Sequence, residues 1–398
     1  MNNSISRRLI VLLAAVFAMT PFAIDSYLPA IPSIARELNV DTAMISITVS
    51  IYVFGLAIGQ LIGGPLSDKF GRMKVMVAGL VIFALCSVML AQADSLYSFW
   101  FWRVVQSLGG GIAVVGVPAT IRDNTEGKES AKLFALIALI SMIAPSIAPS
   151  VGTVIMNLIS WHWIFIISGS LALLVAFAAT RILPKPNKQA APDSPVRYKD
   201  VFTEPKALGY MFSQSFSFAV LMTFIANGAF AYMIHFGVTP EMFSALFLVN
   251  VIGVATVNRI NSYLLNHHAP EKLLVTFISL QVFGTSLLVI SQLIAPGNLW
   301  FAVVGFIVSI SANGGIMANS NASFLKHFGK GAGVASAALG ATQFFTGASL
   351  SALAALLSKD SLWPIVLMMF LASLVSLSGA IKANKHNLLY STPLEANV

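Results

Sequence analysis

The sequence predicts an all-α membrane protein with twelve transmembrane helices in two six-helix halves. Of its 398 residues, 57% are hydrophobic and only 10% are charged, and the mean hydropathy is +0.84. This composition is too apolar for a soluble domain. The apolar residues form runs of about 20 residues, the length that crosses a bilayer, and charged or Pro/Gly-rich turns separate the runs.

Cutting the chain at those turns gives the individual spans. They are expected at about 9–31, 43–64, 73–92, 96–120, 132–157, 162–183, 208–234, 241–264, 272–294, 298–320, 331–357 and 362–382. The first run continues too far, without an A-x-A-like cleavage site, to be a signal peptide. One long connection, rich in proline and charge, divides the chain into an N-terminal six-helix half (1–183), a cytoplasmic linker (184–207) and a C-terminal six-helix half (208–398).

The basic residues predict the orientation in the membrane. With both termini in the cytoplasm, all but three of the 23 lysines and arginines fall on the cytoplasmic side or in its loops. The exceptions are Arg36 and Lys359 outside, and Arg103 within a span. This asymmetry accounts for the formal charge of +8 without a nucleic-acid partner.

A weak internal repeat relates the two halves. Aligning the stretch around Gly55 with the stretch around Gly253 needs no gap and places Asn266 where Asp68 stands, so the charged turn is not repeated. Matches between apolar residues also arise by chance. Three glycines spaced four apart predict a helix-packing seam: Gly55, Gly59 and Gly63.

Two charged residues lie inside predicted spans. Every acid except Asp25 falls in a loop or at a span end, and Arg103 is the one embedded base. A charge inside the bilayer costs roughly 2.5–3.5 kcal/mol, so such residues usually serve function or pairing. The helical rise places both at about 9–11 Å from the outer surface. We expect Asp25 to carry a proton and Arg103 to bias its ionisation. The alternatives are a solvated Asp25 near the surface and an Arg103 that only tethers backbone carbonyls.

The stretch from Gly64 to Lys74 reads as a charged turn between two spans. Its pattern, G-x-x-x-D-[RK]-x-G-[RK]-x-[RK], resembles the signature loop between spans two and three of major facilitator superfamily transporters. The alternative without a specific function is a solvated cytoplasmic loop whose lysines and arginines only follow the positive-inside rule. The resemblance implies a conformational switch, whose candidate residues are Gly64, Asp68, Lys69, Gly71, Arg72, Lys74, Arg122 and Asp123.

Asp68 lies at the C-terminal end of a predicted helix, where the helix dipole disfavours an anion, so it needs a partner. We expect that partner to be the helix N-terminus near Gly331 together with Arg122. Asp123 is expected to pair with Arg72 or Lys69.

Two further stretches resemble motifs of the same superfamily. Arg103 to Gly111 resembles the R-x-x-Q-G-x-G motif of the fourth span, with Gln106 on the Arg103 face of the helix. Ala144 to Gly152 carries two prolines four residues apart, which remove helix hydrogen bonds and bend the chain. It resembles the A-P-x-x-A-P-x-x-G antiporter motif of drug exporters, with Pro145, Pro149 and Gly152 as its candidate residues. A kink needed only for packing is the alternative.

Other stretches narrow the resemblance to one branch. They are Asp25 to Ala30 (D-x-Y-L-P-A), Trp161 to Phe165 with His162 in place of the usual arginine, and Gly340 to Gln343. Together they resemble the bicyclomycin/chloramphenicol-resistance (Bcr/CflA) drug:proton antiporters. The resemblance implies proton-driven multidrug efflux by alternating access, in a bacterial inner membrane, with no cofactor beyond the proton gradient and a monomeric protein. A proton-coupled importer of a small nutrient on the same fold is the alternative.

The single embedded carboxylate also suggests a substrate class. One titratable group balances at most one positive charge, so we expect neutral or monocationic amphipathic compounds. The candidate substrate contacts are Gln106, Tyr52, Phe22 and Phe17, chosen by helical spacing near Asp25 and Arg103. The spans offer no His/Cys/Asp/Glu cluster or Ser/His pair for catalysis, so we expect neither an enzyme nor a metal site.

Overall fold

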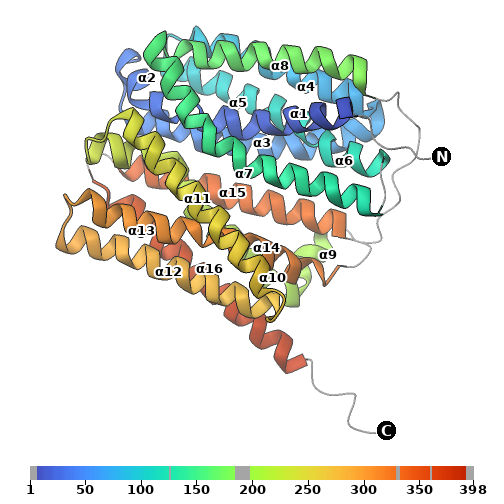
Figure 1. The fold of residues 1–398 in the computed structure, drawn as a ribbon, viewed down its shortest axis with the longest axis vertical. Helices are drawn as coiled ribbons and strands as arrows, with labels where there is room; N and C mark the ends of the chain where they lie inside the picture. The colour runs from blue at the N-terminus through green and yellow to red at the C-terminus, as the bar shows by residue number, and fades with distance from the viewer. Residues whose placement is uncertain (1–6, 125–126, 184–197, 329–331, 359–360, 391–398) are drawn as a thin grey trace. The chain divides into compact units, whose positions relative to one another are not determined.

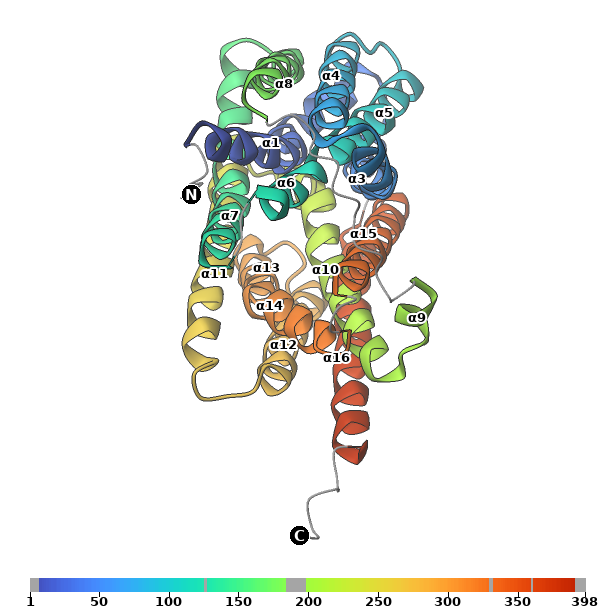
Figure 2. The same cartoon turned by 90° about the vertical axis from the view of Figure 1, so that its right-hand side faces the viewer.

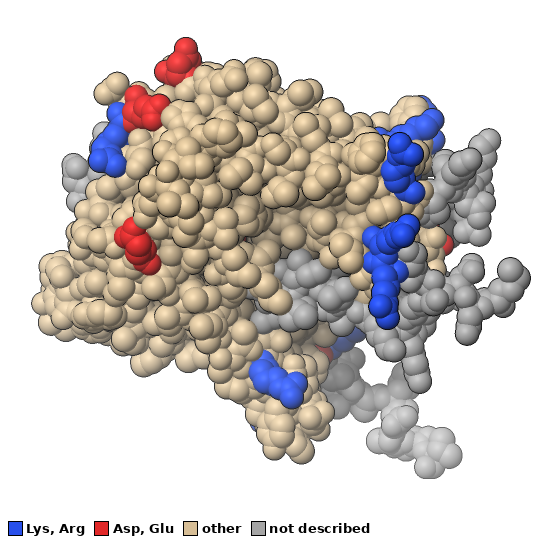
Figure 3. Space-filling view, turned by 45° about the horizontal axis from the view of Figure 1, so that its top comes forward, with Lys and Arg blue, Asp and Glu red and all other residues tan. Residues whose placement is uncertain are grey.

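A computed structural model describes residues 7–124, 127–183, 198–328, 332–358 and 361–390. These residues form helices and connecting turns, with no β-strand among them. Within the described residues, eleven helical stretches are long and apolar enough to cross a membrane, and the shorter apolar stretch Ile143–Leu158 of α7 falls in the remaining predicted span. Figure 3 shows only a few acidic and basic side chains within a broad surface of other residues. The predicted fold class is confirmed.

Two compact units make up the chain. The first contains residues 1–192 and 228–248, and the second contains 193–227 and 249–398. The first unit therefore joins the predicted N-terminal half with a short stretch of the C-terminal one.

The helices of the first unit follow the predicted spans with several breaks. They are α1 (Arg7–Asp25), the 3-10 turn η1 (Leu28–Ala30), α2 (Ile31–Glu37), α3 (Thr42–Phe70), α4 (Arg72–Ala91), α5 (Leu96–Val114), α6 (Gly116–Asn124), α7 (Gly127–Leu158), α8 (His162–Ile182) and the π-helical turn η2 (Phe230–His235). The second unit contains α9 (Tyr198–Thr203), α10 (Pro205–Ala229), α12 (Pro270–Ile294), α13 (Leu299–Ser311), α14 (Asn313–Leu325), α15 (Ala332–Leu357) and α16 (Trp363–Tyr390). Helix α10 ends in the first unit, at Gly228 and Ala229, and α11 (Pro240–Leu264) begins in the first unit and continues in the second.

The predicted glycine seam joins α3 to α5, which lie side by side in Figures 1 and 2. A Cβ atom on Gly59 would lie 3.1 Å from the Cα of Gly111, and one on Gly63 would lie 2.8 Å from the Cα of Ile112. The absent side chains thus let two backbones touch, which confirms the seam. Gly64 has nothing within 4 Å of such a Cβ, so packing does not require its glycine.

The second unit repeats this packing. A Cβ on Gly55 would lie 3.2 Å from the Cβ of Ser107, and a Cβ on Gly253 would lie 3.2 Å from the Cβ of Ser311. The alignment of Gly55 with Gly253 therefore reflects equivalent positions in the two units.

The signature stretch is not the extended turn that its composition suggests. Helix α3 continues through Pro65 to Phe70, and α4 begins at Arg72. Gly71 alone interrupts them, with a φ of 93° that favours glycine. The turn prediction was wrong because the α3 packing seam supports the helix to its end, and a single proline removes only one backbone hydrogen bond.

Candidate functional site

Asp25 is the last residue of α1, and the helix breaks directly after it. Pro29 has no backbone N–H to donate to the carbonyl of Asp25, so the α-helical ladder cannot continue at this point. The Asp25 side chain is only 3% exposed, and its Oδ1 is buried without a hydrogen-bond partner. The structure therefore does not show the solvated carboxylate that was one alternative.

Arg103, on α5, is fully buried and binds the end of α1. One Nη donates to the carbonyl of Ala23 at 2.9 Å, and the other donates to Oε1 of Gln106 at 2.7 Å. The last carbonyls of a helix lack partners within the helix and attract a cation. Within the described residues no ion pair joins Arg103 to Asp25. Arg103 thus makes the carbonyl tether that was the alternative to biasing the ionisation of Asp25.

Three aromatic rings surround the guanidinium of Arg103. Its Cζ lies 4.3 Å from the ring centre of Tyr27, 4.4 Å from that of Tyr52 and 5.8 Å from that of Phe165. Such cation–π contacts partly replace lost hydration. Because Tyr52 is buried against this cation, its ring offers no open face in this structure. Phe17 and Phe22, the other aromatic candidates, are partly exposed.

Gln106 is held at both ends of its amide. Its Oε1 accepts from Arg103, and its Nε2 donates to Oγ of Ser87 at 2.7 Å. Ser87, on α4, donates in turn to the carbonyl of Phe83. Gln106 is fully buried, so its position orients Arg103 and leaves no free polar group for a substrate. Sequence reasoning missed Ser87, because nothing in the pattern of α4 marks this serine.

The antiporter-like stretch packs against the break after Asp25. Helix α7 continues through both Pro145 and Pro149, and Gly152 then lies directly on the backbone of Ser26. A Cβ on Gly152 would lie 2.7 Å from the carbonyl carbon of Ser26 and closer still to its oxygen. The glycine of the motif is therefore a close-contact point between α7 and the residue that follows Asp25.

Beyond Gly152, α7 binds the start of α11 within the first unit. The hydroxyls of Thr153 and Ser244 lie 2.9 Å apart, and Nδ2 of Asn157 donates to Oε1 of Glu241 at 2.7 Å. These contacts fix the same turn of α7 that touches Ser26.

The end of α2 joins the stretch that resembles W-R-W-I-F. Glu37 accepts from Nε1 of Trp161 at 2.7 Å, and its other oxygen lies 3.1 Å from Nε2 of His162. His162 therefore lies where it can pair with Glu37, and an arginine, the usual residue of this motif, could pair with Glu37 in the same way.

At the opposite end of the first unit, Arg72 donates from Nε to Asp123 at 2.9 Å and from Nη1 to Ser67 at 3.2 Å. Of the two expected partners of Asp123, the structure shows Arg72. Lys69 instead lies 5.3 Å from the ring centre of Phe70. The side chains of Asp68 and Arg122, and all of Gly331, lie outside the described residues.

The second unit has an ion pair in the corresponding place. In the first unit, Arg72 at the start of α4 pairs with Asp123 near the end of α6. In the second unit, Glu271 at the start of α12 pairs with Lys326 just after α14. The two pairs thus join equivalent helix ends with their charges exchanged.

The buried polar side chains of the second unit are uncharged. Gln214 donates to Gln343 at 2.7 Å, and Ser217 donates to Asn313 at 3.2 Å. Among the buried side chains that the structure describes across both units, Asp25 and Arg103 are the only charged ones. Both charges that the sequence places inside spans are therefore buried within the protein.

Comparison with known families agrees with this architecture. The model of the family described as Major Facilitator Superfamily matches residues 11–355. The chain belongs to this superfamily. It is a multi-pass membrane transporter rather than an enzyme, and its relatives point to drug resistance.

A bicyclomycin resistance protein homolog of Haemophilus influenzae is 28% identical over 98% of this chain and 99% of its own length. The multidrug resistance protein MdtL of Escherichia fergusonii is 28% identical over 66% of this chain and 68% of its own. The resemblance to drug exporters inferred from the motifs is thereby supported along the whole chain.

Solved transporters share the fold at low sequence identity. The POT family transporter PepTSo has a TM-score of 0.76 at 12% identity, covering 97% of this chain and 99% of its own. A D-xylose-proton symporter has a TM-score of 0.71 at 15% identity, covering 93% of this chain and 97% of its own. At such identity these likenesses concern the fold alone.

Proposed function

We propose that this protein is a proton-driven exporter of amphipathic drug-like compounds that works by alternating access. The observation that carries the proposal is Asp25, a buried carboxyl group at a helix break with an unpaired oxygen and no cation in contact. Burying a charge in this way is costly, so binding and release of a proton changes the energy of the site strongly. The names of the relatives supply the link to drugs.

Asp25 takes up a proton on the outer side of the membrane and releases it inside while substrate moves outward. Movement of the break after Asp25 changes the surroundings of the carboxyl group. Two groups hold that break: Arg103 through the carbonyl of Ala23, and Gly152 through the backbone of Ser26. Arg103 therefore acts by positioning the helix end, and Gln106 and Ser87 position Arg103.

The substrates of this cycle are neutral or singly charged. Moving one elementary charge against 100 mV costs ~2.3 kcal/mol, and one carboxylate compensates one positive charge. The buried groups of the second unit are amides and hydroxyls, which bind neutral polar atoms. Phe17 and Phe22 offer partly exposed rings to the apolar part of the substrate.

The remaining parts of the proposal concern setting and partners. The protein lies in the cytoplasmic membrane with both termini inside, acts as a monomer, and needs no cofactor other than the proton gradient and no nucleic acid. Import of a nutrient by proton symport is disfavoured by the stretch from Ala144 to Gly152 and by the names of the relatives.

The experiment is proton release from everted membrane vesicles when a phenicol-type compound is added. Asp25→Asn removes the titratable group and keeps a similar shape, so we expect normal amounts of protein, no proton release and no drug resistance. Asp41→Asn is the matched control, because Asp41 is an exposed helix cap and asparagine caps equally well. Full resistance and proton exchange in the Asp25 variant would overturn the proposal.

A further inference from the structure

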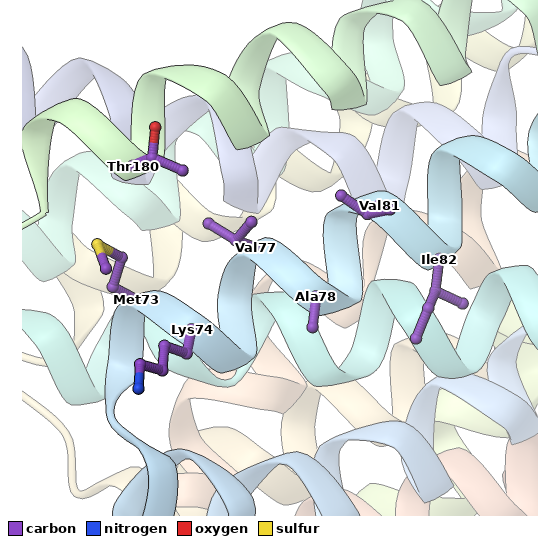
Figure 4. A pocket seen from close by; sticks show the side chains of 7 residues that line it. All are labelled: Met73, Lys74, Val77, Ala78, Val81, Ile82 and Thr180. Atoms are coloured by element: carbon purple, nitrogen blue, oxygen red, sulfur yellow. The ribbon is translucent and has the colours of Figure 1, made fainter.

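An apolar groove lies on the surface of the first unit, away from the Asp25 site. Its volume is about 490 Å³, and Figure 4 shows that α4 supplies most of its lining, with Thr180 on the neighbouring α8. The apolar lining is Met73, Val77, Ala78, Val81 and Ile82, and the polar side chains are Lys74 and Thr180. Figure 4 shows Lys74 and Thr180 toward the same end of the groove, with Ile82 toward the other.

The length and the charge of the groove indicate its occupant. From Lys74 to Ile82 is about 12 Å along the helix at ~1.5 Å per residue. One leaflet of a bilayer has a hydrocarbon thickness of about 15 Å, half of the ~30 Å core. An apolar channel of this length with one cation at its end fits an acyl chain whose head group is anionic.

Lys74 is available for such a head group. It is the last basic residue of the signature stretch, and it does not pair with Asp123, because Arg72 binds that acid. The side chain of Lys74 is exposed, and no ion pair is recorded for it among the described residues. Arg181 follows Thr180 on α8 but does not line the groove, and its guanidinium lies 5.3 Å from the ring centre of Phe177.

The second unit repeats the pattern on different helices. A groove of about 390 Å³ between α10 and α16 is lined by Gly209, Phe212, Val375 and neighbouring residues, with Lys382 as its one charged member. Lys382 is exposed and lies about 10 Å along α16 from Val375, counted at ~1.5 Å per residue. Each unit thus carries a groove lined mainly by apolar residues with a single lysine near one end, and the second groove also contains Ser378.

We propose that each groove binds one acyl chain of an anionic phospholipid, with the phosphate held by Lys74 in one and by Lys382 in the other. A neutral lipid fills the same channel but lacks the charge contact. A basic residue near an anionic head group contributes ~1 kcal/mol, which corresponds to about a fivefold change in affinity.

The test counts bound lipids by native mass spectrometry on the purified full chain, titrated with phosphatidylglycerol or with phosphatidylcholine of the same acyl chains. We expect tighter binding of phosphatidylglycerol, and about fivefold weaker binding at one site in each of Lys74→Gln and Lys382→Gln. Ala78→Phe fills the first groove and should remove one bound lipid.

Two variants control for charge and bulk. Lys385→Gln removes an exposed lysine that lines neither groove, and Leu85→Phe enlarges an exposed residue of α4 outside the groove. Neither should change the count. Equal binding of the two lipids, an equal loss in Lys385→Gln, or occupation of the grooves by a second copy of the chain would overturn the proposal.

Discussion

The contact between Gly152 and Ser26 makes Gly152→Ala the most direct test of how α7 acts on the site proposed to bind the proton. The added Cβ would lie 2.7 Å from the carbonyl carbon of Ser26, whereas ordinary contact begins near 3.4 Å. The carbonyl oxygen of Ser26 would lie closer still, so the two backbones must separate by more than about 0.7 Å. Because the obstacle is backbone, no side-chain rotation relieves it, and overpacking of this kind costs about 1–3 kcal/mol.

That displacement falls on the break beside Asp25 and on the turn of α7 that binds Ser244 and Glu241. We expect Gly152→Ala to lower both the melting temperature of the purified protein and the rate of drug-driven proton release in everted vesicles. Gly152→Leu should lose more of both, because its side chain is larger.

Two glycines provide matched controls for the same substitution. Gly297 and Gly340 have nothing within 4 Å of an added Cβ, so alanine fits at either position. Their alanine variants should melt and transport like the unmodified protein. If Gly152→Ala behaved as they do, the close contact would not govern the site and this reasoning would fail.

Three further predictions concern other contacts. Ser87→Ala leaves the buried Nε2 of Gln106 unpaired, so we expect destabilisation of about 1–3 kcal/mol in thermal melts, and an unchanged melt would refute the positioning chain. Arg72→Asp and Asp123→Arg should each lower transport, and the double swap should restore part of it, although an exposed pair contributes only about 0–1 kcal/mol to stability. Burial, with a neighbouring lysine, lowers the pKa of His327 in the folded protein. As the pH falls below about 6.5, the unfolded state therefore binds a proton at this histidine before the folded state does. The free energy of unfolding should decrease from there until the pH passes the pKa of the folded state. His327→Gln should remove that decrease in melts taken between pH 7.5 and 5.

The sequence could predict which charges matter because membrane burial makes them rare. Asp25 and Arg103 stand out within apolar runs, and the structure buries both. The glycine seam was predictable for a similar reason, since residues four apart share a helix face.

The partners of these residues could not be predicted, because they depend on which helices meet. The contact of Arg103 with Ala23 joins α5 to α1, and the bond of Gln106 to Ser87 joins α5 to α4. Helical spacing gives the face on which a residue lies, but it does not give the atoms opposite that face. Their similar depth suggested that Arg103 acts on the ionisation of Asp25, whereas the cation binds a carbonyl at the end of α1, next to the helix break.

Comparison of the two units indicates which interactions the repeat requires. Gly55 and Gly253 make the same close approach to a serine, because the crossing of two helices leaves no room for a side chain there. The ion pairs at the helix ends need only opposite charges. The first unit therefore has a base at one helix start and an acid at the other helix end, and the second unit, with Glu271 and Lys326, has them the other way round. A buried carboxylate is different, because it is costly and one is enough for one proton in each cycle. If the transporter moves one proton per cycle, only one of its two repeated units needs a buried acid. This agrees with the described part of the chain, in which Asp25 has no buried acidic counterpart in the second unit.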